Sequence, residues 1–378
     1  MVSTPESPQV SAWPDGRRVI VEAFGETPPE AVATRTRLEV QPAPDPASLD
    51  ARDVLVRVRS ASVGWVDLLM TSGQYQHVQS PPYTPGLEFA GEVLWIGAGA
   101  ANDSSLRVGD AVLVDGLLSG PRSHGAHQRW GGFATYAVAP VEAVHRVPGR
   151  LTFDQACNLL GNYETAWHCL VHRGRVQRGE TVLVLGASGS TGLAAVHVAG
   201  LCGATVIATG RSPEKLARVA DEGAAHTLVT GADQPPLRDR VKSLTGGRGV
   251  DIVYDGVGGE LSVEAMRCLR FGGRHLVVGW AATPFVARGQ GQRGAPNANQ
   301  LPTNIIMMKG LDVLGCPAVI SIVENPALRP PRLAQILSWA ASGVLSPVVS
   351  QAHPLEAFRE AMMEKWRGAA VGGIVLHP

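Results

Sequence analysis

The chain has 378 residues, 45% of them hydrophobic, which is enough for about two ordinary domains with buried cores. Its 33 basic and 33 acidic residues give a formal net charge of zero, so no general attraction to nucleic acid or to an anionic membrane is expected. Five cysteines lack CxxC spacing and lie in apolar segments, which predicts free thiols in a reducing compartment.

No apolar run reaches the ~18 residues of a membrane span. The first dozen residues have no signal-peptide pattern. We therefore expect a cytoplasmic protein with a disordered tail over residues 1–16.

The first part of the chain, to about residue 150, consists of short apolar or alternating runs separated by Gly, Pro and Asp. Val56 and Val58 alternate with Arg57 and Arg59, which is the period of a half-exposed strand. This pattern predicts a closed or sandwiched β domain.

From about residue 180, nearly continuous apolar strands alternate with helical stretches rich in Ala and Leu. Such runs fit strands that are covered on both faces, and each strand with its helix forms one βα unit. The segment therefore predicts a doubly wound parallel sheet with strands beginning near residues 181, 204, 226, 251, 275 and 311. A helical run and a final strand, GGIVLHP, close the chain.

The most specific motif is a buried strand that runs directly into a small-residue turn and then a helix. Small residues let backbone N–H groups approach a pyrophosphate, and the helix N-terminus favours its negative charge. The alternatives are a tight turn with another purpose and a nucleophile elbow, but Ser190 stands where that elbow needs its closing glycine. The motif thus predicts dinucleotide binding by Gly186, Ser188, Gly189, Ser190, Thr191 and Gly192.

The end of the second strand of this region indicates which dinucleotide is bound. An acidic residue there would bind an unphosphorylated ribose, and none is present. The cationic and hydroxyl groups that replace it suit a 2′-phosphate, although an ordinary solvated helix start would have the same composition. We therefore expect NADPH rather than NADH, held by Gly210, Arg211, Ser212 and Lys215.

With these motifs placed, the chain from about residue 17 to its end resembles the zinc-independent quinone oxidoreductase-like branch of the medium-chain dehydrogenase/reductase superfamily. The similarity is carried in order by SASVGWVDLLMTSGQY, PPYTPGLEFAGEV, VGDAVLV, GGFATYAV, NYETAW, VLGASGSTG, GVDIVYDGVGG, LVVGW and GGIVLHP. The resemblance implies an α/β protein in which a GroES-like β-barrel catalytic domain (17–157 and 346–378) accompanies a Rossmann NADPH-binding domain (158–345). It also implies a homodimer and a catalytic cleft between the domains.

Alcohol dehydrogenases of this superfamily hold a catalytic zinc, and the resemblance allows the matching places to be compared. This chain has Gly64, Leu87 and Gly161 near those places, with Glu88 following, so a complete ligand set is missing. His124 and His127 form an HxxH pair without an evident third ligand. We expect no metal.

Without a Lewis acid, oxidation of a simple alcohol is disfavoured, whereas a quinone or an α,β-unsaturated carbonyl spreads the incoming charge. Ligands of such sheets lie beyond the carboxyl ends of the strands, which places the nicotinamide end near Val257, Gly279 and Trp280. Tyr75 matches a family tyrosine near the nicotinamide and is the catalytic candidate, with strand-edge packing as its alternative.

Several departures from the family pattern bear on the substrate. Gly64 replaces a common active-site Asn, and Gly373 replaces a lysine, so one contact near the cofactor is expected to be lost. Insertions at 115–130 and 283–299 should border the cleft. An enoyl-thioester or alkenal reductase, and an NADPH-binding interaction protein of low turnover, remain alternatives. The ARGQGQRG segment is interpreted as a solvated loop without a nucleic-acid partner.

Overall fold

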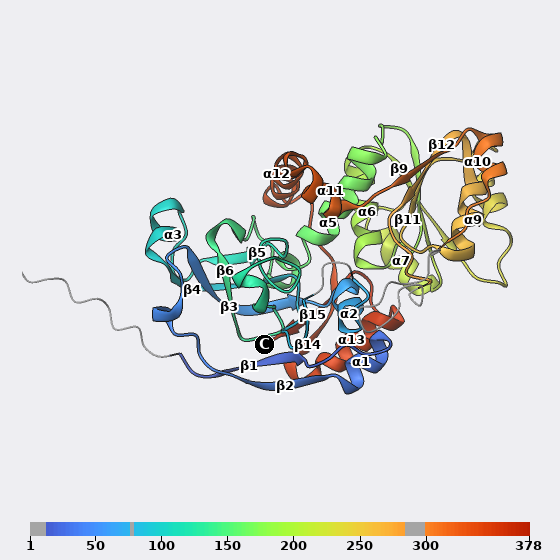
Figure 1. The fold of residues 1–378 in the computed structure, drawn as a ribbon. Coiled ribbons are helices and arrows are strands. Elements are labelled where there is room, and N and C mark those ends of the chain that lie inside the picture. The colour runs from blue at the N-terminus through green and yellow to red at the C-terminus, as the bar shows by residue number, and fades with distance from the viewer. Residues whose placement is uncertain (1–12, 76–78, 284–298) are drawn as a thin grey trace, which may run out of the picture.

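The computed structural model describes residues 13–75, 79–283 and 299–378 and contains two large β-sheets that form separate lobes (Figure 1). One sheet is parallel with helices in its connections, and the other is mostly antiparallel. The expected α/β class, with a Rossmann sheet beside a GroES-like unit, is confirmed. Residues 1–12 of the expected tail and most of the 283–299 insertion lie outside the described residues, whereas Gly16, the last residue of that expected tail, begins a strand.

The parallel sheet has the strand order β10-β9-β8-β11-β12-β13. The order reverses between the neighbouring strands β8 and β11, which is the switch point where such sheets bind ligands. All six strands expected from the apolar runs are present, and β12 begins six residues earlier than its most apolar part. The strands are β8 (Thr181–Val184), β9 (Thr205–Gly210), β10 (His226–Val229), β11 (Val250–Asp255), β12 (Leu269–Val277) and β13 (Asp312–Gly315).

The second sheet has the order β14-β15-β3-β4-β5-β7, and β6 pairs with β3. Its strand β15, at the end of the chain, is antiparallel to β3 near its beginning, so the C-terminal segment completes the N-terminal sheet. The domain boundaries themselves stay a prediction. The strands are β3 (Asp53–Ser62), β4 (Phe89–Ile96), β5 (Ala111–Val114), β6 (Tyr136–Pro140), β7 (Val144–Arg146), β14 (Val349–Pro354) and β15 (Gly373–His377), while β1 (Gly16–Val21) and β2 (Thr36–Gln41) form a separate pair.

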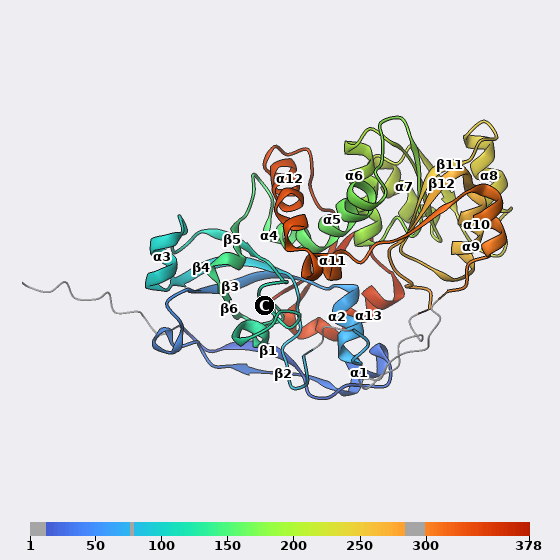
Figure 2. The ribbon, with the colours of Figure 1, turned by 45° about the horizontal axis from the view of Figure 1, so that its top comes forward.

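Helices connect and cover these sheets, and α5, α11 and α12 lie where the two lobes approach each other (Figure 2). No helix of the described ranges is long and apolar enough to cross a membrane. The helices are α1 (Pro28–Thr34), α2 (Trp65–Thr71), α3 (Ala98–Asp103), α4 (Phe153–Ala156), α5 (Leu160–Trp167), α6 (Ser190–Leu201), α7 (Pro213–Asp221), α8 (Leu237–Leu244), α9 (Gly259–Cys268), α10 (Thr303–Lys309), α11 (Ala318–Glu324), α12 (Arg329–Ala341) and α13 (Phe358–Arg367).

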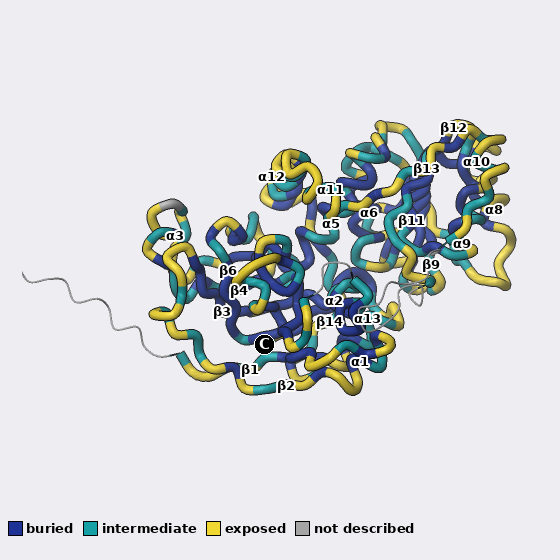
Figure 3. Tube along the Cα trace, in the orientation of Figure 1, coloured by how far each residue is buried: buried dark blue, intermediate teal, exposed yellow. Residues whose placement is uncertain are grey.

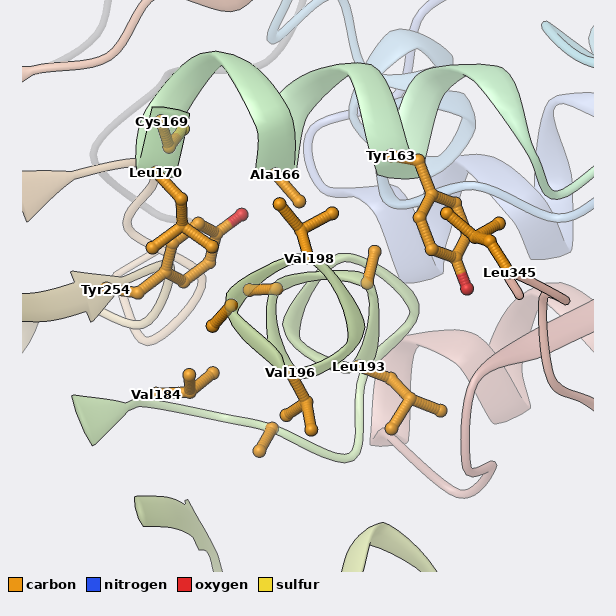
Figure 4. Packing of buried hydrophobic residues seen from close by; sticks show 14 of the residues in the cluster. Tyr163, Ala166, Cys169, Leu170, Val184, Leu193, Val196, Val198, Tyr254 and Leu345 are labelled. Carbon is orange, nitrogen blue, oxygen red and sulfur yellow. The ribbon is translucent and has the colours of Figure 1, made fainter. Parts of the chain in front are cut away.

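Helix α6 lies in the largest core cluster because its residues are small or apolar on nearly every side. Figure 3 shows buried chain running through the interiors of both lobes. In Figure 4, Val198 of α6 is directed toward Ala166 of α5, and Val196 lies beside Val184 of β8. The helix therefore fixes β8 against α5, and with it the turn that joins β8 to α6.

This tight packing predicts different results for alanine at two glycines of α6. A Cβ at Gly192 would lie 2.4 Å from the carbonyl oxygen of Gly186, whereas a Cβ at Gly200 meets nothing within 4 Å. We expect Gly192→Ala to lower the free energy of unfolding by about 1–3 kcal/mol through overpacking. Gly200→Ala, its control, should be neutral or stabilising by up to about 1 kcal/mol because it removes backbone entropy from the unfolded chain. Urea denaturation measures both, and equal stabilities of the two variants would contradict the packing role of Gly192.

Candidate active site

The turn between β8 and α6 leaves the helix N-terminus without a side-chain cap. Gly186 has φ +64, which only glycine adopts without strain, and a Cβ on it would lie 2.9 Å from Val257. Gly189 is the N-cap residue, and no side chain bonds the first N–H groups of α6. A Cβ on Gly189 would make only ordinary contacts, so protein packing does not require a glycine there. Because uncapped N–H groups at the start of a 12-residue helix attract an anion, this turn fits a pyrophosphate.

The second strand, β9, ends beside this turn, as the N–H of Ala187 donates to the carbonyl of Thr209 at 2.9 Å. The four residues expected there have different surroundings. Ser212 caps α7 by accepting from the N–H of Lys215, and the ammonium of Lys215 donates to the carbonyl of Gly368. Arg211 is exposed and pairs with no carboxylate among the described residues. Burial, and then the charge of Arg211, lower the pKa of Lys215.

The loops after β11 and β12 complete this edge of the sheet, and they place Val257 beside Gly279 and Trp280. The N–H of Gly279 donates to the carbonyl of Asp255, and a Cβ on Gly258 would lie 3.0 Å from the Cα of Trp280. The buried Asp255 carboxylate accepts from the N–H groups of Val257 and Gly258 at 3.0 and 2.8 Å. Although burial opposes it, the hydrogen bond from His275 contributes to a lowered pKa of Asp255. The structure thus brings the sequence-predicted dinucleotide residues to one edge.

The antiparallel lobe reaches this edge through the start of β15. The N–H of Gly372 donates to the carbonyl of Ser188 at 2.8 Å, and the hydroxyl of Ser190 donates back to the carbonyl of Gly372 at 2.7 Å. Thr191 on α6 donates to Asn162 on α5 at 3.1 Å. The phosphate turn is therefore held between the two lobes.

A small cavity of about 30 Å³ lies next to α5 and receives ionisable groups from both lobes. Arg329 on α12 pairs with both Asp115 and Glu164, and the fully buried Arg332 pairs with Glu164 at 2.8 Å. Asp115, Gly116, Leu117 and Arg122 of the 115–130 insertion line this cavity. That the insertions border the catalytic cleft stays a prediction. The lining residues are Glu88, Asp115, Gly116, Leu117, Arg122, Leu160, Gly161, Glu164, Thr165, Ala318, Val319, Ile322, Arg329 and Arg332.

Two buried carboxyl groups of the antiparallel lobe, Glu88, which lines this cavity, and Asp67, have raised pKa values. Burial raises the pKa of Glu88 to about 7, against the opposing effects of Arg122 and of the Gly161 N–H, which donates to Glu88 at 2.5 Å. Burial also raises the pKa of Asp67 to about 6. The Asp67 carboxylate accepts from three backbone N–H groups, so it organises the loops of its own lobe.

The places that match zinc ligands in alcohol dehydrogenases hold no alternative metal site in the described residues. No three His, Cys, Asp or Glu side chains gather there closely enough to hold an ion. The Nε2 atom of His127 instead lies 2.7 Å from the Oδ1 atom of Asp53. Tyr75 is partly buried, packs against the cluster of Val21, Met70, Tyr83 and Leu87, and is not among the residues that line the cavity. Its catalytic role stays a prediction.

Sequence reasoning missed most of the charged groups around the cavity. In the sequence, Glu88 stands out only as part of an incomplete zinc-ligand set, and Arg329 and Arg332 belong to a segment, RPPRLAQIL, whose sequence shows no functional pattern. Glu88 meets Gly161 73 residues away, and Arg329 meets Asp115 214 residues away. Only the folded chain brings these groups together.

Comparisons with known proteins assign this architecture to a family. Residues 50–149 match the model of the alcohol dehydrogenase GroES-like domain, and residues 190–328 match that of the zinc-binding dehydrogenase. The chain is 30% identical to quinone oxidoreductase-like protein 2 of Mus musculus over 332 residues, which cover 88% of this chain and 86% of that protein. It belongs to the medium-chain dehydrogenase/reductase superfamily, quinone oxidoreductase-like branch.

Other members of this superfamily match over nearly the whole chain. The quinone oxidoreductase of Homo sapiens is 29% identical over 357 residues, covering 94% of this chain and 96% of its own. A mycobacterial protein solved as a complex with NADPH is 26% identical, with a TM-score of 0.75 and coverage of 96% and 100%. The chain is accordingly an oxidoreductase with the dinucleotide-binding fold of this superfamily.

The raised pKa of Glu88 predicts a pH-dependent effect of Glu88→Gln on stability. Since the folded-state pKa of about 7 lies above the usual value of 4.5, the folded wild type binds more protons between these values. The stability of the wild type therefore falls as the pH rises from about 4.5 to about 7. Glutamine does not titrate, so Glu88→Gln lacks this contribution. We expect the unfolding free energy of Glu88→Gln, relative to wild type, to increase from pH 5 to pH 8. Urea denaturation at several pH values measures this, with Glu356→Gln at a 51% exposed side chain as the control for lost charge. A difference that stays constant over this range would contradict the burial effect.

Proposed function

We propose that this chain is an NADPH-dependent oxidoreductase that reduces a quinone or an α,β-unsaturated carbonyl acceptor without zinc. The observation that carries the proposal is the edge of the parallel sheet, where the uncapped start of α6 adjoins the exposed Arg211. NADPH, when bound, would supply the hydride. The protein then has to hold the cofactor, position the acceptor and provide a route for one proton.

The choice of NADPH rests on the positive charge at the end of β9. Arg211 and Lys215 lie close enough for the charge of one to lower the pKa of the other. A bound anion would relieve this repulsion, and a 2′-phosphate would supply it. With Ser212 capping α7 and Lys215 bonded to Gly368, Arg211 would provide the main phosphate contact.

The residues at the zinc-matching places support the proposed acceptor class. Gly64 has no side chain and Leu87 is buried and apolar, so neither can ligate a metal. Reduction of a conjugated acceptor spreads the developing negative charge over several atoms. It therefore depends less on a metal ion than oxidation of a simple alcohol, in which an alkoxide must be stabilised. The nicotinamide end of the site is assigned to Val257, Gly279 and Trp280, with Tyr75 as the hydrogen-bond donor to the acceptor oxygen. A carbon–carbon double-bond reductase for enoyl thioesters or alkenals would use the same site.

Homodimerisation across the parallel sheets is part of this proposal. β13 is the last strand of the sheet within the described residues, and apolar side chains are exposed on and near this edge. They include Phe271, Met307, Met308 and Val313, which are 75%, 74%, 70% and 37% exposed. A cytoplasmic setting suits the five cysteines, all of which are free thiols.

Removal of one guanidinium tests the cofactor assignment. We expect Arg211→Ala to weaken NADPH binding about tenfold or more and to leave NADH binding nearly unchanged, because only NADPH carries the 2′-phosphate. Fluorescence titration of both cofactors measures this, with Arg218→Ala on the last turn of α7 as the control. Equal affinities of the unmodified protein for NADPH and NADH would refute the assignment.

Turnover assays test the reaction itself. We expect the purified protein to oxidise NADPH with quinones or enones, to retain this activity in a metal chelator and to contain no stoichiometric zinc. In the same assay, Tyr75→Phe should lower turnover roughly 10- to 100-fold without changing NADPH affinity, if the hydroxyl bonds the acceptor in the transition state. Binding of NADPH without turnover across quinones, enals and enoyl thioesters would favour an interaction protein, and zinc lost together with activity would exclude the zinc-free mechanism.

A further inference from the structure

A lysine from the antiparallel lobe reaches the phosphate turn of the parallel lobe. Lys365 lies near the end of α13, and its Nζ is 2.6 Å from the hydroxyl oxygen of Ser190, the first residue of α6. Since the Ser190 hydroxyl donates to the carbonyl of Gly372, its lone pairs are free to accept from the ammonium. The serine therefore directs the lysine to the start of the helix.

This position is unfavourable for a cation unless an anion accompanies it. The N-terminus of a helix carries a partial positive charge, which repels an ammonium group. Burial lowers the pKa of Lys365 to about 8, although the more distant Asp67 and Glu88 carboxylates oppose this effect. Among the described residues no carboxylate lies within ion-pair distance of Lys365, and α6 has no acidic residue in its first turn. A partly buried charge without a counter-ion costs stability. The presence of Lys365 at this place is therefore explained if an anion binds beside it.

The end of α13 is also tied to the other half of the expected cofactor site. One turn after Lys365, the carbonyl of Gly368 accepts from Lys215, and a Cβ on Gly368 would lie 3.5 Å from the guanidinium of Arg211. A short segment of α13 thus adjoins both the turn after β8 and the end of β9, and Figure 1 shows α13 near α6 and α7. The charged groups that face this segment are Asp67, Glu88, Arg211 and Lys215, together with the His353–Glu364 pair.

We propose that Lys365 binds the pyrophosphate of the dinucleotide, with Ser190 holding its ammonium in place. The inference rests on the proposed function, because it assigns a residue to the same cofactor site. It differs from the role of Arg211, since the pyrophosphate is common to NADPH and NADH whereas the 2′-phosphate is not. A lysine that only ties the two lobes together is the competing explanation.

Binding measurements with both cofactors separate these explanations. Lys365→Met keeps the length of the side chain without its charge, Lys365→Arg keeps a charge, and Lys242→Met on the exposed face of α8 is the matched control. By fluorescence titration at pH 7, Lys365→Met should weaken NADPH and NADH equally, about tenfold or more. Lys365→Arg should restore most of this loss, and Lys242→Met should bind both cofactors as the wild type does. Unchanged binding of both cofactors by a folded Lys365→Met protein would overturn the inference.

Proton uptake gives a second result that a structural tie would not produce. A phosphate beside Lys365 should raise its pKa above about 8, so the wild type should take up a fraction of a proton on binding NADH at pH 8.5. Calorimetry in two buffers of different ionisation enthalpy measures this uptake, which Lys365→Met should lose. Without cofactor, Lys365→Met should have a higher Tm than the wild type at pH 7, because it removes the uncompensated charge.

The outcomes also distinguish this inference from the proposed function. A wild type that binds neither cofactor would refute the proposed function and this inference together. Cofactor binding and turnover by the wild type, with equal proton uptake by wild type and Lys365→Met, would refute the role of Lys365 alone. A Lys365→Met protein with a lower Tm and unchanged affinity would establish the structural tie instead.

Discussion

The close approach of Gly192 to the backbone of Gly186 determines how α6 leaves the end of β8. Any side chain at Gly192 would meet the Gly186 carbonyl, and α6 is packed on several sides by the largest core cluster. The helix therefore cannot shift to make room or rotate to find another cap. Its first N–H groups remain directed toward the space beyond the sheet, where neither the turn nor the first helical turn supplies an anion. A dinucleotide site thus follows from packing that has its origin in the core.

The C-terminal segment of the antiparallel lobe contacts the turn between β8 and α6 of the parallel lobe. Gly372 exchanges hydrogen bonds with Ser188 and Ser190, and the strand that follows, β15, pairs with β3. A displacement of one lobe relative to the other must therefore break or bend these bonds beside the expected pyrophosphate. Cofactor binding at this place would couple to the arrangement of the two lobes, because the groups that hold the lobes together also surround the ligand.

The sequence predicted features that depend on neighbouring residues and missed those that depend on tertiary contacts. The turn from Gly186 to Gly192, the six parallel strands and the charged end of β9 were all predicted, since each depends on local spacing or apolar runs. The bond from Lys215 to Gly368 spans 153 residues, and the bond from Lys365 to Ser190 spans 175. The Gly373 replacement predicts the loss of one cofactor contact, and the side chain of Asn158 lies against this glycine. Lys365 supplies a cation nearby from α13, whose pattern in sequence is that of an ordinary amphipathic helix.

Burial favours the neutral forms of three ionisable groups, the carboxyl groups of Asp67 and Glu88 and the amine of Lys365. It raises the pKa of Asp67 to about 6 and of Glu88 to about 7, and it lowers the pKa of Lys365 to about 8. A dianionic pyrophosphate beside Lys365 would favour the protonated form of this lysine, because it attracts the ammonium. Binding should then be linked to proton uptake at Lys365 above pH 8, so affinity should decrease as the pH rises through this range. Proton uptake of this kind would offset part of the negative charge that the cofactor brings, because burial holds Lys365 partly in its neutral form before the cofactor binds.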